Sequence, residues 1–154
     1  MSPPYLDTSA LAKWYFNEPF SEEVEEYLAT LPYVLISALT IVEMRSLLLR
    51  RRRAGELTPA LVERIWATFQ EDQATGALTV LEVKGEHFQA AARLLDRVEA
   101  PLRTLDAMHL ALAEGAGAGE CATADRTLAA GARELGLEVR TFFDDRPLAK
   151  PTEG

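Results

Sequence analysis

Short apolar runs alternate along this chain with longer segments whose apolar residues recur every three or four positions. The short runs have the length of buried strands and cover residues 3–7, 33–36, 78–83, 120–123 and 138–142. The longer segments have helical periodicity; they cover residues 8–17, 21–31, 39–54, 86–98, 104–114 and 126–135, and one more begins at Thr58-Pro59. This alternation predicts an α/β fold, a three-layer sandwich whose central, mostly parallel, five-stranded sheet is flanked by helices.

The chain is long enough for one domain with a substantial core. Its 154 residues fit a single unit, and no repeat or interdomain linker interrupts residues 1–143. Beyond them the sequence contains Pro147, Pro151 and the terminal Gly154. We therefore expect a single domain over residues 1–143 and a flexible C-terminal tail over residues 144–154.

The net charge of −8 limits what the protein can bind. An acidic surface lacks the phosphate attraction that dominates non-specific binding, which excludes a general DNA or RNA coat protein. Positive charge is concentrated in one block, formed by Arg45 and residues 50–53. Bound divalent ions would also cancel acidic charge locally. The charge distribution is therefore compatible with a small nuclease.

Three further features indicate the compartment. Cys121 is the only cysteine, which excludes an internal disulfide, and its apolar neighbours indicate a buried thiol. No N-terminal run resembles a signal peptide. The longest apolar run, around residues 33–42, has about half the length of a membrane span. We expect a cytoplasmic protein with no membrane partner.

Four widely spaced acids each stand where a predicted strand ends or a predicted helix begins. They are Asp7, Glu43, Asp106 and Asp125. Strand ends meet at one edge of a parallel sheet, so these carboxylates can share one pocket. Crowded carboxylates repel one another unless a cation neutralises them, and hard divalent ions prefer oxygen ligands. The set predicts a metal-dependent enzyme that acts on a phosphate.

Each acid also has a purely structural interpretation. Asp7 and Asp125 precede predicted helices, where an acid can serve as the N-cap. Residues 40–43 match a capping box, and Asp106 lies at the positive end of its helix. Hydroxyl residues accompany the acids, however, and such hydroxyls orient metal ligands and hold metal-bound water. These neighbours are Thr8, Ser9, Thr40, Thr104 and Thr123. Taken as a set, the acids and hydroxyls favour a metal site.

Four motifs resemble the PIN domain. They are Asp7-Thr-Ser-Ala-Leu after the first strand, Ser37-x-x-Thr40-x-x-Glu43, Leu105-Asp106-Ala107 with Ala111 further on, and Thr123-Ala-Asp125-x-x-Leu128. Their order and spacing most closely resemble the VapC-type toxins of prokaryotic toxin–antitoxin pairs. The resemblance extends from Tyr5 to Phe142.

The resemblance implies a metal-dependent endoribonuclease that acts as a toxin. In that family four acids bind one or two Mg²⁺ or Mn²⁺ ions, and the enzyme cuts RNA. The matching catalytic and metal-binding residues are Asp7, Glu43, Asp106 and Asp125, and the supporting residues are Thr8, Ser9 and Thr123. The resemblance also implies a homodimer and a cognate VapB-type antitoxin. Two of the acids, Asp7 and Asp106, are expected to coordinate directly, and the other two partly through water.

Other residues have two interpretations each. Arg50 follows Glu43 by two helical turns, about 10 Å along one face, so it could contact an RNA backbone or simply complement the end of its helix. His109 lies one turn after Asp106 and could bond to it, but we expect a half-buried helix histidine without a metal role. Residues 14–16 are three consecutive aromatics, of which one is expected to lie in an exposed patch covered by a partner.

Three other functions compete with the nuclease. A catalytically silent PIN-like module that binds RNA or protein would normally lack one or more of the acids, and all four are present. A receiver or phosphatase with Asp7 as phosphoacceptor would need a lysine near the sheet edge, and Lys13, Lys84 and Lys150 do not follow a strand end. The glycine-rich residues 115–119 precede a strand rather than a helix, which argues against a dinucleotide site.

Overall fold

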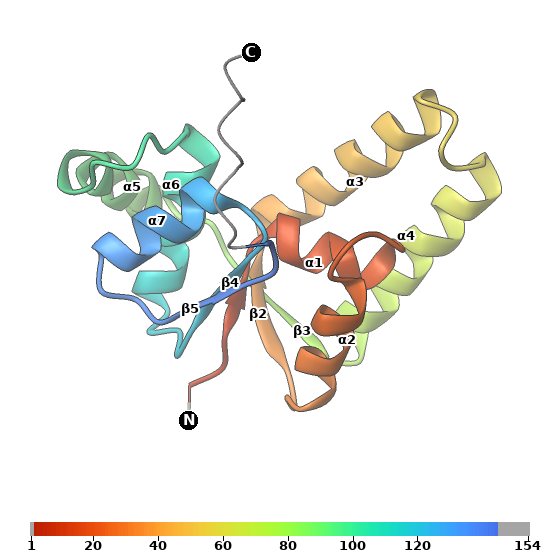
Figure 1. Ribbon diagram of the computed structural model, residues 1–154, viewed down its shortest axis with the longest axis horizontal. Coiled ribbons are helices and arrows are strands. Elements are labelled where there is room, and N and C mark those ends of the chain that lie inside the picture. The colour runs from red at the N-terminus through yellow and green to blue at the C-terminus, as the bar shows by residue number, and fades with distance from the viewer. Residues whose placement is uncertain (1, 145–154) are drawn as a thin grey trace, which may run out of the picture.

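Five parallel strands form the centre of the protein, in a computed structural model that describes residues 2–144 (Figure 1). In spatial order the strands are β3 (Leu78–Leu81), β2 (Val34–Ser37), β1 (Tyr5–Leu6), β4 (Cys121–Thr123) and β5 (Val139–Thr141). Each neighbouring pair runs parallel. The predicted five-stranded sheet and the flanking helices are confirmed. The predicted C-terminal tail falls almost entirely on residues 145–154, outside the described residues.

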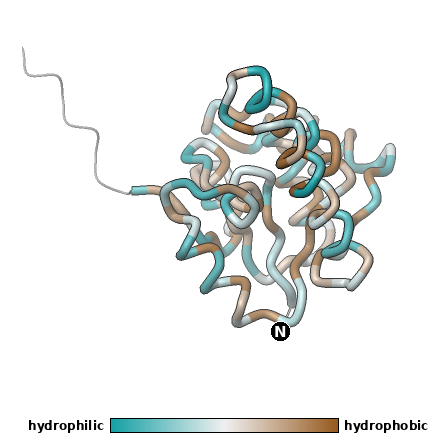
Figure 2. The backbone as a smooth tube through the Cα atoms, turned by 90° about the vertical axis from the view of Figure 1, so that its right-hand side faces the viewer, coloured by the Kyte–Doolittle hydropathy of each residue, from teal (hydrophilic) through white to brown (hydrophobic). Residues whose placement is uncertain are grey.

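Seven described helices cover the two faces of the sheet. They are α1 (Thr8–Tyr15), α2 (Ser21–Ala29), α3 (Ala38–Arg53), α4 (Pro59–Ala74), α5 (Gly85–Arg97), α6 (Thr104–Gly115) and α7 (Arg126–Glu134). Figure 1 shows α1 to α4 on one side and α5 to α7 on the other. Hydrophobic and hydrophilic residues alternate along these helices (Figure 2), as expected where one side of a helix packs on a sheet.

Every residue of the three central strands, β2, β1 and β4, is buried. Because successive side chains point in opposite directions, these strands are covered on both faces. Leu6, Ile36 and Ala122 belong to the core beneath α1 to α4. Cys121 packs instead with the core beneath α5 to α7, and Tyr5 packs with Leu112 of α6. Cys121 is a buried free thiol, as predicted.

The chain order creates a switch point at the centre of the sheet. From β1 the chain builds outward through β2 to β3, and then returns to place β4 on the other side of β1. Tyr5 is paired with Leu35 of β2 and with Cys121 of β4. Asp7 therefore leaves the sheet between two neighbouring strand ends, which is where open α/β sheets bind ligands.

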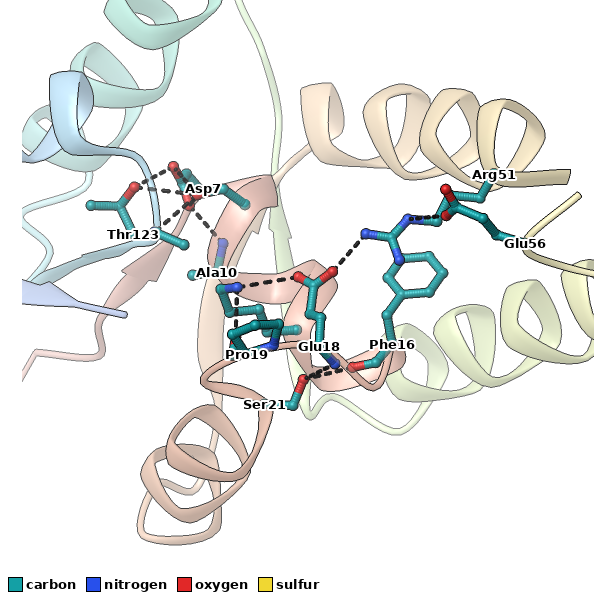
Figure 3. Close-up of polar contacts among 12 residues, drawn as sticks. Asp7, Ala10, Phe16, Glu18, Pro19, Ser21, Arg51, Glu56 and Thr123 are labelled. Atoms are coloured by element: carbon teal, nitrogen blue, oxygen red, sulfur yellow. Dashed lines mark hydrogen bonds and ion pairs between the residues drawn. The ribbon is translucent and has the colours of Figure 1, made fainter. Parts of the chain in front are cut away.

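The far end of α3 is fixed to the loop between α1 and α2 (Figure 3). The Arg51 guanidinium lies 2.6 Å from Glu18 Oε2 and 4.2 Å from the centre of the Phe16 ring. Lys13 also contacts Glu18, at 3.3 Å. One arginine of the basic run thus stabilises the fold rather than remaining free for a ligand.

The aromatic residues at positions 14–16 divide between core and surface. Phe16 is buried, whereas Trp14 and Tyr15 are half-buried. Trp14 lines an apolar cavity of about 220 Å³ together with Tyr33. The expectation that a partner covers this patch stays a prediction. Among the described residues no helix is both long enough and apolar enough to cross a membrane.

Candidate metal and active site

All four predicted acids line one cavity of about 400 Å³ at the carboxyl edge of the sheet. β1 places Asp7, the second turn of α3 places Glu43, the first turn of α6 places Asp106, and the end of β4 places Asp125. The same cavity is lined by Thr8, Ser9, Arg103 and His109. The structure therefore brings together every acid that the sequence selected.

Asp7 is the most buried of the four carboxylates, with 3% of its surface exposed. It is the N-cap of α1, since its Oδ1 accepts from Ala10 N–H at 3.0 Å. Ser9 Oγ donates at 2.8 Å to Oδ1 and lies 2.9 Å from Oδ2. Thr123 Oγ1 donates at 2.6 Å to Oδ2 (Figure 3). Burial raises the pKa of Asp7, although His109 and these hydrogen bonds oppose the shift.

The three hydroxyl residues expected to support the acids all contact them. Thr123 Oγ1 accepts from Asp125 N–H at 2.9 Å while donating to Asp7, so it links two of the acids. Ser9 Oγ accepts from Ala124 N–H at 2.9 Å, which holds α1 against the end of β4. Thr8 Oγ1 donates to Glu43 Oε1 at 3.0 Å.

Acids that cap helices also line the cavity, so a capping role does not exclude a role in the site. Asp125 is the N-cap of α7 and accepts from Leu128 N–H at 2.9 Å, while Asp106 Oδ2 accepts from Arg103 N–H at 2.9 Å. The Arg103 guanidinium lies 3.8 Å from Asp106 and 3.9 Å from Asp125. Its side chain is 83% exposed, so this attraction is weak and leaves both acids available.

The predicted capping box at residues 40–43 is wrong. β2 extends to Ser37, which is the N-cap of α3, so the helix already begins at Ala38. Thr40 therefore lies inside the first turn, fully buried, with its hydroxyl 3.4 Å from that of Thr8. Glu43 is free to point into the cavity because it does not cap its own helix.

Glu43 is held by His109, for which the sequence predicted no role in the site. His109 Nε2 lies 2.6 Å from Glu43 Oε1, and its Nδ1 lies 2.6 Å from the Tyr5 hydroxyl. His109 is only 3% exposed, so the prediction of a half-buried ring is wrong. Its two ring nitrogens contact Tyr5 and Glu43 rather than Asp106, the alternative partner. Burial alone would raise the pKa of Glu43, but His109 and Thr8 outweigh burial and lower it.

A second cavity of about 530 Å³ adjoins the acids and contains Arg50. The two cavities share the side chains of Thr8, Ser9, Glu43 and Leu105. Arg50 is exposed, unlike the neighbouring Arg51, so it lies where the sequence placed a contact for an RNA backbone. That role stays a prediction.

Comparison with known proteins identifies the family. The family model for the PIN domain matches residues 5–134. The chain belongs to the PIN-domain family. It is 32% identical over 145 residues to Ribonuclease VapC46 of Mycobacterium tuberculosis, an alignment that covers 90% of this chain and 97% of the relative. The resemblance to VapC-type proteins is thus confirmed.

Solved structures show the same PIN fold. VapC20 of Mycobacterium tuberculosis, a toxin that cleaves the sarcin–ricin loop, superposes with a TM-score of 0.65 at 19% identity, over 82% of this chain and 93% of VapC20. VapBC2 of Rickettsia felis, solved with a DNA fragment from its promoter, gives a TM-score of 0.64 at 14% identity. That match covers 90% of this chain and 98% of the compared chain.

The donors of this PIN site suit a hard divalent ion. Four carboxylates and several hydroxyls supply oxygen alone, the ligand type that Mg²⁺ and Mn²⁺ prefer. Within residues 2–144, no three or more carboxylate, imidazole or thiol side chains are grouped closely enough to form a ready-made cage. Mg²⁺ does not need one, because it usually binds through one or two carboxylates and keeps several waters.

One sequence signal could have revealed the role of His109. α6 is buried from Ala107 to Ala113, and His109 is the one polar side chain in that otherwise apolar stretch. A polar group so placed must find a hydrogen-bond partner inside the protein. The sequence does not say which partner, because Glu43 and Tyr5 belong to other elements.

Proposed function

We propose that this protein is a metal-dependent endoribonuclease, the toxin of a toxin–antitoxin pair. The observation that carries the proposal is the state of Asp7, which is buried next to three other acids. None of the ion pairs seen within residues 2–144 involves Asp7. A buried carboxylate outside any ion pair is costly unless a bound cation completes the site. The name of the relative Ribonuclease VapC46 supports RNA as the substrate.

The four acids have distinct roles in this proposal. Asp7 and Asp106 coordinate one or two Mg²⁺ or Mn²⁺ ions directly, while Glu43 and Asp125 act partly through water. A bound divalent ion supplies an acidified water and stabilises the charge that develops during phosphodiester hydrolysis. The lowered pKa of Glu43 makes it a carboxylate at neutral pH, which suits a ligand better than a general base. Asp7 must lose its proton to coordinate, because its pKa is raised.

The supporting residues fix the direction of these carboxylates. Ser9 and Thr123 each donate a hydrogen bond to the Asp7 carboxylate, which prevents it from rotating out of the cavity. Thr8 does the same for Glu43. Arg50, two turns along α3, binds a phosphate of the RNA strand that passes the acids. Its guanidinium offers positive charge in the cavity next to the acids.

The partners follow from the relatives. Two of the similar solved structures, VapBC2 of Rickettsia felis and FitAB, are named as two-component complexes and contain bound DNA. By analogy this chain pairs with a VapB-type antitoxin and forms a homodimer. A cytoplasmic location agrees with an RNA substrate and a reduced Cys121.

A cleavage assay tests the function. Purified protein is incubated with total cellular RNA in Mg²⁺, Mn²⁺ or EDTA, and the new RNA ends are sequenced. We expect discrete cuts in either metal, none in EDTA, and none with Asp7→Asn. Asp96→Asn, on the exposed surface of α5, is the matched control and should cut like wild type. RNA that stays intact in every metal, with protein that is folded and free of antitoxin, would instead support a silent binding module.

A further inference from the structure

A buried chain of hydrogen bonds leads from the sheet to Glu43. It begins at Ser37, where the Tyr5 hydroxyl lies 3.0 Å from Oγ. It continues from that hydroxyl to His109 Nδ1 at 2.6 Å, and from His109 Nε2 to Glu43 Oε1 at 2.6 Å. Tyr5 and Ser37 are completely buried, and His109 nearly so. Two of its members, His109 and Glu43, line the cavity that holds the acids, and Glu43 is the more exposed of the two.

From this chain we infer that His109 is a positioning residue, which orients Glu43 toward a bound divalent ion. The inference rests on the metal site of the proposed function and adds a residue to it. His109 touches neither the ion nor the RNA in this account. It acts through Glu43 Oε1, which leaves Oε2 as the oxygen available to the ion or to its water.

The direction of the bonds supports an orienting role. Glu43 is a carboxylate at neutral pH and can only accept, so Nε2 must carry the hydrogen between them. The Tyr5 hydroxyl can donate to Nδ1 or accept from it, because Ser37 Oγ lies on its other side. Both ring nitrogens are therefore satisfied, and the ring is fixed in one orientation.

The positions of the elements explain why such a bond is needed. Glu43 has a long, flexible side chain on α3, whereas Asp106 lies one turn before His109 on α6. α6 is buried along most of its length and is correspondingly rigid. Through His109, the same helix that carries one acid also fixes another. The separation of Glu43 and Asp106 is thereby set by a single element.

A histidine that only filled the core would behave differently. Its loss would lower the stability of the protein but leave the metal affinity of the folded molecule unchanged. An orienting histidine affects metal affinity directly, and losses of such outer partners typically cost ten- to a hundredfold. Metal affinity in the absence of RNA therefore separates the two roles.

The experiment measures Mn²⁺ binding to the full-length, metal-stripped protein by the electron paramagnetic resonance signal of free Mn²⁺. We expect His109→Leu to weaken binding about ten- to a hundredfold. His109→Gln should recover part of the loss, because its amide can donate to Glu43. Tyr5→Phe removes one hydroxyl from the chain and should have a smaller effect. His87→Leu, at the start of α5 and outside this cavity, is the control and should bind like wild type.

A double mutant identifies the route. If His109 acts through Glu43, His109→Leu should cause no further loss in a Glu43→Gln background. Equal Mn²⁺ affinity in wild type and the folded His109 variants would overturn the inference and leave the proposed nuclease intact. Wild type that binds no Mn²⁺ would overturn the metal site and the inference with it. Thermal unfolding of each metal-free variant establishes whether it is folded. If His109→Leu is unfolded, His109→Gln and Tyr5→Phe test the inference in its place.

Discussion

Thr123 Oγ1 donates a 2.6 Å hydrogen bond to Asp7 Oδ2 across 116 residues of sequence. The bond exists because β1 and β4 are neighbours in the sheet, so the carboxyl ends of these two strands meet at one edge. The same hydroxyl accepts from Asp125 N–H, which ties the second acid to the first. Thr123 thereby fixes the relative positions of two predicted metal ligands.

Replacing Thr123 by valine should therefore affect both the ligands and the fold. Val has nearly the same shape but leaves a buried Asp7 oxygen and the Asp125 N–H without this partner. We expect Mn²⁺ affinity to fall about ten- to a hundredfold. The free energy of unfolding should fall by about 1–3 kcal/mol. Calorimetric titration and urea unfolding measure the two effects.

Thr141→Val on β5 is the matched control, because Thr141 has the same side chain at an equivalent strand position but is outside the cavity. It should leave Mn²⁺ affinity unchanged. A Thr123→Val protein with wild-type affinity would show that the strand ends alone hold Asp7 in place.

The raised pKa of Asp7 predicts how stability depends on pH without metal. The folded protein binds this proton more tightly than the unfolded chain, whose aspartate has the ordinary pKa of 3.8. The free energy of unfolding should therefore decrease as the pH rises from 3.8 to the raised value, and the stabilising contribution is absent above it. Asp7→Asn cannot lose a proton there, so in EDTA it should be more stable than wild type at neutral pH.

Bound Mn²⁺ should make wild type more stable than Asp7→Asn, the reverse of their order in EDTA. At a free Mn²⁺ concentration of 100 times the dissociation constant, binding should stabilise wild type by about 2.7 kcal/mol and leave Asp7→Asn nearly unchanged. Thermal unfolding with Mn²⁺ and with EDTA, at several pH values, measures both effects. An Asp7→Asn protein that is less stable than wild type in EDTA at neutral pH would mean that the carboxylate is satisfied without an ion.

The sequence predicted the fold and the convergence of the four acids on one cavity because both depend on local patterns. Strand ends and helix starts can be recognised from apolar periodicity, and Asp7, Asp106 and Asp125 stand at such boundaries. The wrong predictions for Thr40 and His109 had a common cause. The position of Thr40 depended on where β2 stops, and the role of His109 depended on α6 packing beside α3. Contacts between distant elements leave little trace in a local pattern.

The different surroundings of the adjacent residues Arg50 and Arg51 also could not be predicted from the sequence, because they depend on contacts between distant elements. Arg50 lines the cavity beside Glu43, whereas Arg51 pairs with Glu18. If Arg50 binds one RNA phosphate, Arg50→Ala should raise KM for RNA cleavage several-fold with little change in kcat. The slope of log affinity against log salt should fall by about 0.7, the value for one contact to a single strand.

Arg52→Ala provides the control for Arg50, because Arg52 is exposed and does not line the cavity. Its KM and its salt dependence should match those of wild type. Equal losses in both variants would indicate that the whole basic run attracts RNA through its net charge rather than through a defined phosphate contact.

Arg51→Ala should show the opposite behaviour, a loss of stability with little change in metal affinity. It removes a partly buried ion pair with Glu18 and the contact with the Phe16 ring, which together amount to about 1–2 kcal/mol. Urea unfolding measures this loss, and Arg53→Ala, an exposed change at the end of α3, should leave the midpoint unchanged.

Because Arg51 holds the far end of α3 and Glu43 lies near its start, a folded Arg51→Ala protein should still bind Mn²⁺ normally. Weaker Mn²⁺ binding in that variant would mean that the position of Glu43 depends on the whole helix and not on His109 and Thr8 alone.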